Sequence, residues 1–262
     1  MYNRAASSPV RLKAQDWEGF PRLKASDAVF LKEHRDRLRA RFAAHGFDGF
    51  CKEEILELVL SYAAPKKDPR LLSEELLKRF KGLRGLLDAT PEELGQTGCF
   101  AESGYVFLKL LKEAAGAYLN ERITGEEIIT DARGLLDYLT LTLSGERIEK
   151  FLAVYLNARN EALAVEVLHE GTINQTVVYP RKAIERAFKH NARAVIFVHN
   201  HPSGDPTPSG MDRQLTKVLD RAAAAVDLTV LDHIIIGRSG HHSAREHGWV
   251  MGFPMHHRAA SP

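Results

Sequence analysis

Two histidines, a serine and an aspartate share one short stretch, His199-Asn-His-Pro-Ser-Gly-Asp-Pro-Thr-Pro-Ser-Gly-Met-Asp212. Side chains two apart in an extended chain point the same way, so the imidazoles of His199 and His201 can reach one point. The loop after them turns the chain back, and Ser209 can open a helix with Asp212 in its first turn. Two neutral nitrogens and one carboxylate leave one tetrahedral position open, which is the composition of a catalytic zinc site rather than a structural one.

A water molecule at such an ion becomes a nucleophile near neutral pH. The reaction then needs a carboxylate that shuttles the proton and a donor near the developing oxyanion, and Ser209 is placed for the second role. Each half of the pattern has a plainer interpretation. A His-x-His arises by chance, and a serine three residues before an aspartate is also a helix-capping pattern. Their occurrence together across one Pro- and Gly-rich loop favours the metal site.

The elements that must position these residues are strands and helices in alternation. We expect a helix over 132–141, strands over 151–156 and 162–168 joined by a turn, a helix from Pro180 to about residue 190, and strands over 194–198 and 228–236. The strand over 194–198 delivers the two histidines at its end. A helix that follows Ser209 delivers Asp212.

The first half of the chain has a different texture. Apolar residues recur at helical spacing from about residue 30 to residue 122, which predicts a small all-helical domain. The expected organisation is therefore a leader, a helical domain, a linker, a mixed domain and a tail, over residues 1–25, 26–122, 123–131, 132–252 and 253–262.

Composition places the chain among folded globular proteins, with 262 residues, 44% hydrophobic and 27% charged. The absence of an apolar run of about 18 residues argues against a membrane span. Two cysteines are too few for a disulfide framework, which favours a reducing, cytoplasmic location. A net charge of +2 gives no global attraction for polyanions. A local basic cluster over 32–41 could touch nucleic acid, although a solvated helix face is the favoured interpretation.

The pattern His199-x-His201-Pro202 with Ser209-x-x-Asp212 resembles the motif of the JAMM (JAB1/MPN) metalloprotease superfamily. Four further segments are similar to its bacterial RadC branch: Val198–Asp205, Gly171–Asn174, Tyr179–Arg181 and Leu231–Gly237. The resemblance is strong over 130–250, and Glu54–Leu60 with Lys67-Asp68 extends it into the helical domain. It implies an α+β chain: a small, helix-hairpin-helix-like N-terminal domain, then a mixed α/β JAMM/MPN domain of cytidine deaminase-like fold.

The resemblance also implies roles for single residues. Zinc would be held by His199, His201 and Asp212, and Ser209 would stabilise the tetrahedral intermediate. A catalytic glutamate precedes an early strand in the family, and Glu149 precedes the strand over 151–156. The alternatives for this role are Glu146, Glu166 and Glu170. The chain departs from the family at Gly210-Met211, where acidic residues are usual, and at Tyr179, where a histidine is common; neither position is a ligand.

The leading hypothesis is hydrolysis of a peptide or isopeptide bond in a protein or peptide substrate that the sequence does not identify. The alternative is a DNA-associated repair or recombination protein that binds DNA through its helical domain. The segment Gly98–Gly104 stands where a helix-hairpin-helix turn would hold a phosphate, but Phe100 replaces the middle glycine. A metal-free interaction module is a third possibility, which the complete ligand set disfavours. His233 could be a partner of the metal site, although a satisfied core histidine is the favoured interpretation. The oligomeric state is not readable from the sequence.

Overall fold

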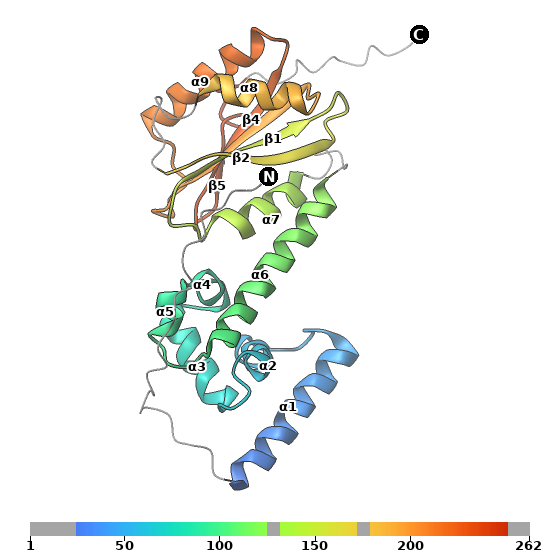
Figure 1. The fold of residues 1–262 in the computed structure, drawn as a ribbon, viewed down its shortest axis with the longest axis vertical. Coiled ribbons are helices and arrows are strands. Elements are labelled where there is room, and N and C mark those ends of the chain that lie inside the picture. The colour runs from blue at the N-terminus through green and yellow to red at the C-terminus, as the bar shows by residue number, and fades with distance from the viewer. Residues whose placement is uncertain (1–24, 125–131, 172–178, 251–262) are drawn as a thin grey trace. The chain divides into compact units, whose positions relative to one another are not determined.

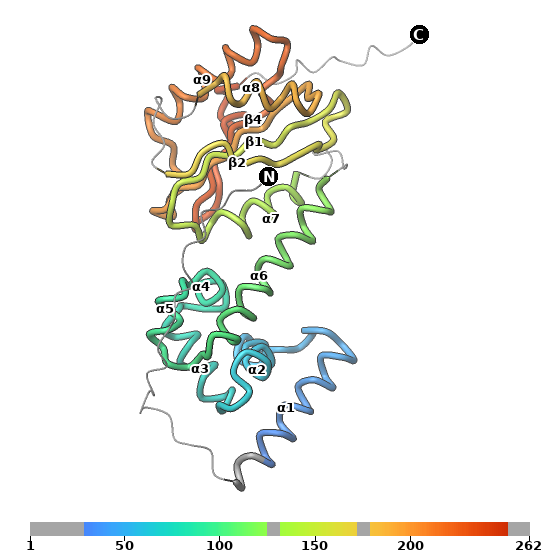
Figure 2. The backbone as a smooth tube through the Cα atoms, in the orientation of Figure 1, coloured from blue at the N-terminus to red at the C-terminus, as the bar shows by residue number. Residues whose placement is uncertain are grey.

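The structure is a computed structural model that describes three ranges of the chain: 25–124, 132–171 and 179–250. The predicted leader before residue 25, linker residues 125–131, segment 172–174 of the RadC-like pattern, and the tail lie outside the described residues. The chain divides into two compact units, Met1–Glu113 and Ala114–Pro262. The division falls inside helix α6, Glu102–Ile123, which Figures 1 and 2 show as one continuous helix.

The first unit contains helices throughout its described part. They are α1 (Ala25–His45), α2 (Lys52–Ala63), α3 (Pro69–Phe80), α4 (Leu83–Asp88), α5 (Pro91–Gly95) and the first half of α6. Local sequence sets their starts: Thr90 caps α5 in a reciprocal box with Glu93, and Pro91 occupies the first turn. A core of buried leucines from α2 to α6 then holds them together.

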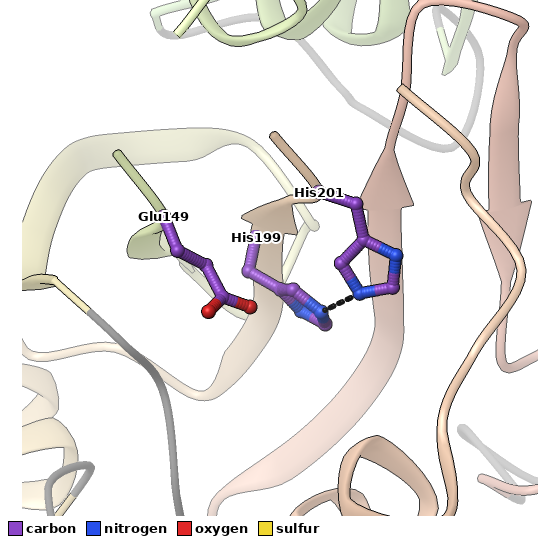
Figure 3. Close-up of side chains that lie close together, drawn as sticks. All are labelled: Glu149, His199 and His201. Atoms are coloured by element: carbon purple, nitrogen blue, oxygen red, sulfur yellow. Dashed lines mark hydrogen bonds between the residues drawn. The ribbon is translucent and has the colours of Figure 1, made fainter. Parts of the chain in front are cut away.

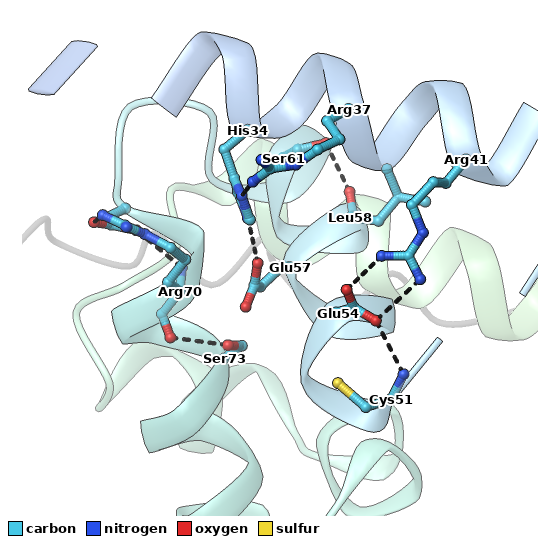
Figure 4. A network of polar contacts seen from close by, with 11 residues as sticks. His34, Arg37, Arg41, Cys51, Glu54, Glu57, Leu58, Ser61, Arg70 and Ser73 are labelled. Atoms are coloured by element: carbon cyan, nitrogen blue, oxygen red, sulfur yellow. Dashed lines mark hydrogen bonds and ion pairs between the residues drawn. The ribbon is translucent and has the colours of Figure 1, made fainter. Parts of the chain in front are cut away.

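The basic cluster over 32–41 lies on α1, and much of its charge is used inside this unit (Figure 4). Arg41 pairs with Glu54 of α2 at 2.5 Å. His34 contacts Glu57 of α2 at 2.5 Å and Arg37 at 2.9 Å. These contacts account for Arg41 and His34 by the packing of α1 on α2.

The second unit is built on a five-stranded sheet in the order β2-β1-β3-β4-β5. After α7 (Ala132–Leu143), the elements are β1 (Lys150–Leu156), β2 (Ala162–Glu170), α8 (Pro180–Lys189), β3 (Ala194–Asn200), α9 (Gly210–Ala224), β4 (Thr229–Ile236) and β5 (His241–Ser243). Strand β1 pairs antiparallel with both β2 and β3. Strands β3 and β4 are parallel and are joined through α9, while β5 returns antiparallel to β4.

Both faces of the sheet are buried, which explains the unbroken apolar sequence of β1. Phe151, Ala153 and Tyr155 pack with α8 and α9 on one face. Leu152 and Val154 pack with α7 on the other. Figure 1 shows α8 and α9 together on one side of the sheet and α7 on the opposite side.

The predicted α+β class is confirmed, with helices first and a mixed sheet flanked by helices after them. Two details differ from expectation. Strand β3 does not stop at Val198 but continues through His199 to Asn200, because these residues keep pairing with β4. The short edge strand β5, which contains the polar pair His241-His242, is not among the predicted strands. In the described part of the chain, no helix has the length and apolar character needed to span a membrane.

Candidate metal centre

The histidine pair lies where β3 ends. His199 is fully buried on the sheet face that packs with α8 and α9, and its ring stacks on Phe151. His201 is partly exposed, and its backbone amide donates to the carbonyl of Ile236 at 2.9 Å. This bond continues the pairing of β3 with β4 past the formal end of β3. The two imidazoles therefore leave an extended backbone on the same side, as their spacing predicts.

The loop from His201 to Ser209 is held by hydrogen bonds within the loop and by one from Ser239. Gly204 has φ +91, a conformation that L side chains rarely adopt, and the Ser239 amide donates to its carbonyl at 3.1 Å. Asp205 accepts from the amide of Thr207 at 2.9 Å, and its carbonyl accepts from His201 Nδ1, also at 2.9 Å. A carbonyl only accepts, so His201 carries its hydrogen on Nδ1 and its Nε2 presents a lone pair.

The start of α9 holds Asp212 in place. Ser209 is the N-cap residue: its Oγ accepts from the Asp212 amide at 3.2 Å, and the Asp212 carboxylate accepts from the Ser209 amide at 2.6 Å. Asp212 is therefore both a member of the helix cap and a predicted metal ligand. The cap fixes the direction of a buried carboxylate, because the Ser209 amide holds Asp212 Oδ2 while the Asp212 amide is bound to Ser209 Oγ.

The side chains of the three predicted ligands lie close together in a compact group, called here the ligand triangle, in which each histidine contacts a different oxygen of Asp212. His199 Nε2 is 3.1 Å from His201 Nε2 and 3.3 Å from Asp212 Oδ1, and His201 Nε2 is 3.5 Å from Asp212 Oδ2. Zinc bonds of about 2.0 to 2.1 Å in a tetrahedron place neighbouring ligand atoms about 3.3 Å apart. Each of the three separations is close to such an edge.

The electrostatics of the triangle favour a cation. Burial alone raises the pKa of Asp212, but its hydrogen bonds to His199 and His201 hold that pKa far below the usual range. The same contact with Asp212 raises the pKa of His201, against the lowering effect of burial. A carboxylate that stays ionised beside two imidazole nitrogens attracts a positive charge, either a proton or a metal ion.

Glu149 faces this triangle from the segment before β1 (Figure 3). One of its carboxylate oxygens and one nitrogen from each of His199 and His201 all lie within 4.8 Å of one another. The other three glutamates weighed for the base have partners elsewhere. Glu146 pairs with Lys150 at 2.9 Å, Glu166 with His190 at 2.8 Å, and Glu170 lies 4.0 Å from Lys150. Of the four, Glu149 is the glutamate that the structure groups with both histidines.

Asn200, between the two histidines, is a site residue that sequence reasoning missed. Its side chain is buried and points to the opposite side of β3 from His199. Its Oδ1 accepts from the amide of Lys150 at 2.8 Å, and its Nδ2 donates to the carbonyls of Ile148 at 3.2 Å and Glu146 at 3.4 Å. Asn200 thus clamps the segment that carries Glu149 to the strand that carries both histidines.

His233 of β4, which the sequence offered as a possible partner of the metal site, contacts His199 on the side of its ring opposite to the ligand triangle. It is buried, and its Nε2 is 2.9 Å from His199 Nδ1. Burial lowers its pKa well below the usual value, and the neighbouring His199 lowers it further, so the ring is neutral. The favoured interpretation of His233 as a core histidine was incomplete, because the parallel pairing of β3 and β4 brings the two rings together.

The hairpin-like turn of the first unit is shaped by packing. Gly98 has φ +60, and Phe100 packs partly buried against the leucine core. At the start of α6, Gly104 lies so close to α2 that an added Cβ would clash with the Ala63 carbonyl. Helix packing therefore explains both Phe100 and Gly104.

Comparison with known proteins gives consistent matches over most of the chain. A family model described as the RadC-like JAB domain matches residues 129–249. A UPF0758 protein of Ruegeria pomeroyi is 37% identical over 221 residues, which covers 84% of this chain and 99% of the relative. A UPF0758 protein of Fusobacterium nucleatum is 34% identical over 224 residues, covering 83% of this chain and 97% of the relative. His199, His201, Asp212 and Glu149 all lie inside the matched domain. The chain belongs to the RadC family, with a C-terminal domain of the JAB (JAMM) type.

Proposed function

We propose that this protein is a zinc-dependent metallopeptidase of the JAMM type that hydrolyses a peptide or isopeptide bond. The observation that carries the proposal is the ligand triangle, in which the two histidine nitrogens lie 3.1 Å apart and 3.3 and 3.5 Å from the two oxygens of Asp212, each close to the edge of a zinc tetrahedron. The donor set supports it as well. Two neutral imidazoles and one carboxylate suit zinc and leave a position open for chemistry.

Within this proposal, His199, His201 and Asp212 hold the zinc ion, and each is fixed by a separate element or loop. The bound ion would acidify a water molecule and polarise the scissile carbonyl. Glu149 takes the proton of the attacking water and later gives it to the leaving amine. Its carboxylate lies within 4.8 Å of both histidine nitrogens, which places it close to where that water would bind.

Ser209 supplies the remaining group. Its Oγ accepts from the Asp212 amide, and that bond does not use the hydrogen of the hydroxyl. The hydroxyl can therefore donate to the oxyanion that develops on the carbonyl oxygen. A serine at this position both starts α9 and serves the reaction.

The test uses Glu149→Gln as a substrate trap. This variant keeps the three ligands and loses the proton shuttle, so it should load zinc, retain substrate and turn it over about 100- to 10,000-fold more slowly. Proteins captured by the trap are incubated with the wild type, and mass spectrometry of the new termini identifies the bond that is cut. The matched control is Glu146→Gln. It changes a nearby glutamate that pairs with Lys150 and is not grouped with the histidines.

We expect cleavage by the wild type and by the Glu146 variant, and none after zinc is removed by a chelator. Cleavage by Glu149→Gln at the wild-type rate would contradict the assigned base. Cleavage that persists without zinc would contradict the proposed chemistry altogether.

A further inference from the structure

Behind His199 runs a chain of buried polar groups that the three ligands do not include. The Nε2 atom of His233 is 2.9 Å from His199 Nδ1, and its Nδ1 atom is 2.6 Å from the hydroxyl of Thr216. The Thr216 hydroxyl in turn donates to the backbone carbonyl of Asp212 at 2.7 Å. The chain thus starts at one ligand residue, crosses β4 and α9, and ends on the backbone of another. His233 and Thr216 are each 1% exposed, so water does not compete for these bonds.

The direction of each hydrogen bond follows from the far end. A hydroxyl has one hydrogen, and Thr216 gives it to the Asp212 carbonyl, which can only accept. Toward His233 the hydroxyl oxygen must therefore accept, so His233 carries its hydrogen on Nδ1. A neutral imidazole has one such hydrogen, so His233 Nε2 accepts from His199 Nδ1. His199 is then left with a lone pair on Nε2, the atom that faces His201 and Asp212.

The opposite direction has two costs. If Thr216 donated to His233, the hydrogens would shift along the chain and place one on His199 Nε2, where it would block a metal. The same reversal would remove the Thr216 hydrogen bond to the backbone carbonyl of Asp212 in the first turn of α9.

A packing role in the core does not by itself explain why a histidine stands at position 233. The rings of Phe151 and Phe197 meet His233 edge-on, and a phenyl ring would serve such packing equally well.

We propose that Thr216 and His233 are positioning residues, which hold His199 in the tautomer with a free Nε2 lone pair and thereby strengthen zinc binding. The inference rests on the zinc site of the proposed function and adds two residues to it. It parallels the arrangement at His201, whose Nδ1 donates to the Asp205 carbonyl. Loss of a hydrogen-bond partner of this kind typically weakens metal binding about 10- to 100-fold.

Two substitutions break the chain at different points. His233→Phe removes the acceptor for His199 and keeps an aromatic ring between Phe151 and Phe197. Thr216→Val keeps the shape and removes the hydroxyl. His233→Gln is a rescue variant, because its amide offers one acceptor and donors in place of the two ring nitrogens.

Each substitution has a matched control in the same unit. Thr142→Val removes a threonine that makes the same backbone bond four residues back, to Tyr138 at 2.8 Å, on α7. His190→Phe removes a histidine that stacks on Tyr155 and pairs with Glu166, away from the triangle. Far-UV circular dichroism and thermal unfolding establish that every variant is folded before its affinity is measured.

The first measurement is the zinc dissociation constant of the full chain, by competition with a chromophoric chelator. We expect it to rise about 10- to 100-fold in His233→Phe and Thr216→Val, to recover partly in His233→Gln, and to keep the wild-type value in both controls. The second is the long-range ¹⁵N–¹H NMR spectrum of the imidazoles, in which His233 should carry its hydrogen on Nδ1.

Wild-type zinc affinity in both folded variants, or a hydrogen on His233 Nε2, would overturn the inference while leaving the proposed function standing. A wild-type protein that binds no zinc would overturn the proposed function and the inference with it. The two failures are therefore told apart by the wild-type titration alone.

Discussion

Replacing Asn200 with leucine should loosen the segment that carries Glu149 while leaving the zinc ligands in place. The side chain is 1% exposed and makes bonds of 2.8 and 3.2 Å to Lys150 and Ile148, with a longer one of 3.4 Å to Glu146. Leucine has a similar volume but no polar atoms. The substitution therefore removes the partners of a backbone amide and of two carbonyls without opening a large cavity.

The size of the effect follows from these partners. Each buried polar group left without its partner costs about 1 to 3 kcal/mol, and two of the three bonds have good length, which gives a loss of about 3 kcal/mol. For a chain of this size, a loss of about 1 kcal/mol lowers the unfolding temperature by about 2 to 4 °C, so the expected fall is about 6 to 12 °C.

The assay combines thermal unfolding with amide hydrogen exchange. The Lys150 amide donates directly to Asn200, so its exchange should accelerate in Asn200→Leu, while zinc affinity stays at the wild-type value. The control is Asn157→Leu. Asn157 holds the β1–β2 turn by accepting from the amides of Arg159 at 2.8 Å and Glu161 at 3.1 Å. This control should lose stability without faster exchange at Lys150.

The reasoning fails if Asn200→Leu unfolds at the wild-type temperature and the Lys150 amide exchanges no faster. It fails differently if zinc affinity falls as steeply as the stability does. In that case Asn200 would support the ligands themselves rather than the segment of Glu149.

Three further predictions concern pH, the helix cap and the first unit. In the zinc-free protein, the pKa of His201 is raised, so its stabilising contribution is full below the ordinary pKa of 6.5 and is lost as pH rises through the pKa in the folded state. The pKa of Asp212 is lowered, so its stabilising contribution is full above the ordinary pKa of 3.8 and is lost as pH falls through the pKa in the folded state. The margin in unfolding temperature of wild type over Asp212→Asn should therefore peak between these values and shrink toward pH 8; a margin that grows toward pH 8 would contradict the pairing. Ser209→Ala should lower the free energy of unfolding by about 1 kcal/mol through the lost cap, whereas Ser209→Asn should keep the cap and still lose turnover. Thermal unfolding measures the first effect and the cleavage assay the second. Gly104→Ala should clash with the Ala63 carbonyl and lower the unfolding temperature without changing zinc affinity; an unchanged temperature would refute the close approach of α6 to α2.

Local sequence patterns were enough to predict much of the fold. The apolar runs of β1 and β3 are continuous because both faces of the sheet are covered, and this gave strands near 151–156 and 194–198. Ser209 and Asp212 were expected at the start of a helix from capping chemistry, and α9 begins there. The end of β3 was misjudged because its last two residues are polar, and only pairing with β4 keeps them extended.

The contacts of the supporting residues could not be predicted in this way, because they join residues distant in sequence. Asn200 holds a segment 50 residues earlier, at Lys150. His233 reaches His199 across the parallel pair of β3 and β4, at a sequence separation of 34. Spacing within one stretch suggested the proposed ligands, whereas tertiary pairing decides which other polar residues contact them. The edge strand β5 was missed for a related reason, since its pairing with β4 outweighs its polar sequence.

The most direct test of the central claim is the zinc content of the full-length protein, combined with X-ray absorption at the zinc edge. We predict one tightly held zinc ion per chain, with nitrogen and oxygen ligands at about 2.0 to 2.2 Å and no sulfur. Both the ion and this signature should be lost in Asp212→Ala and His199→Ala, and retained in His241→Ala, which changes an exposed histidine on β5. A protein that takes up no zinc, or whose zinc remains after either ligand is removed, would contradict the account.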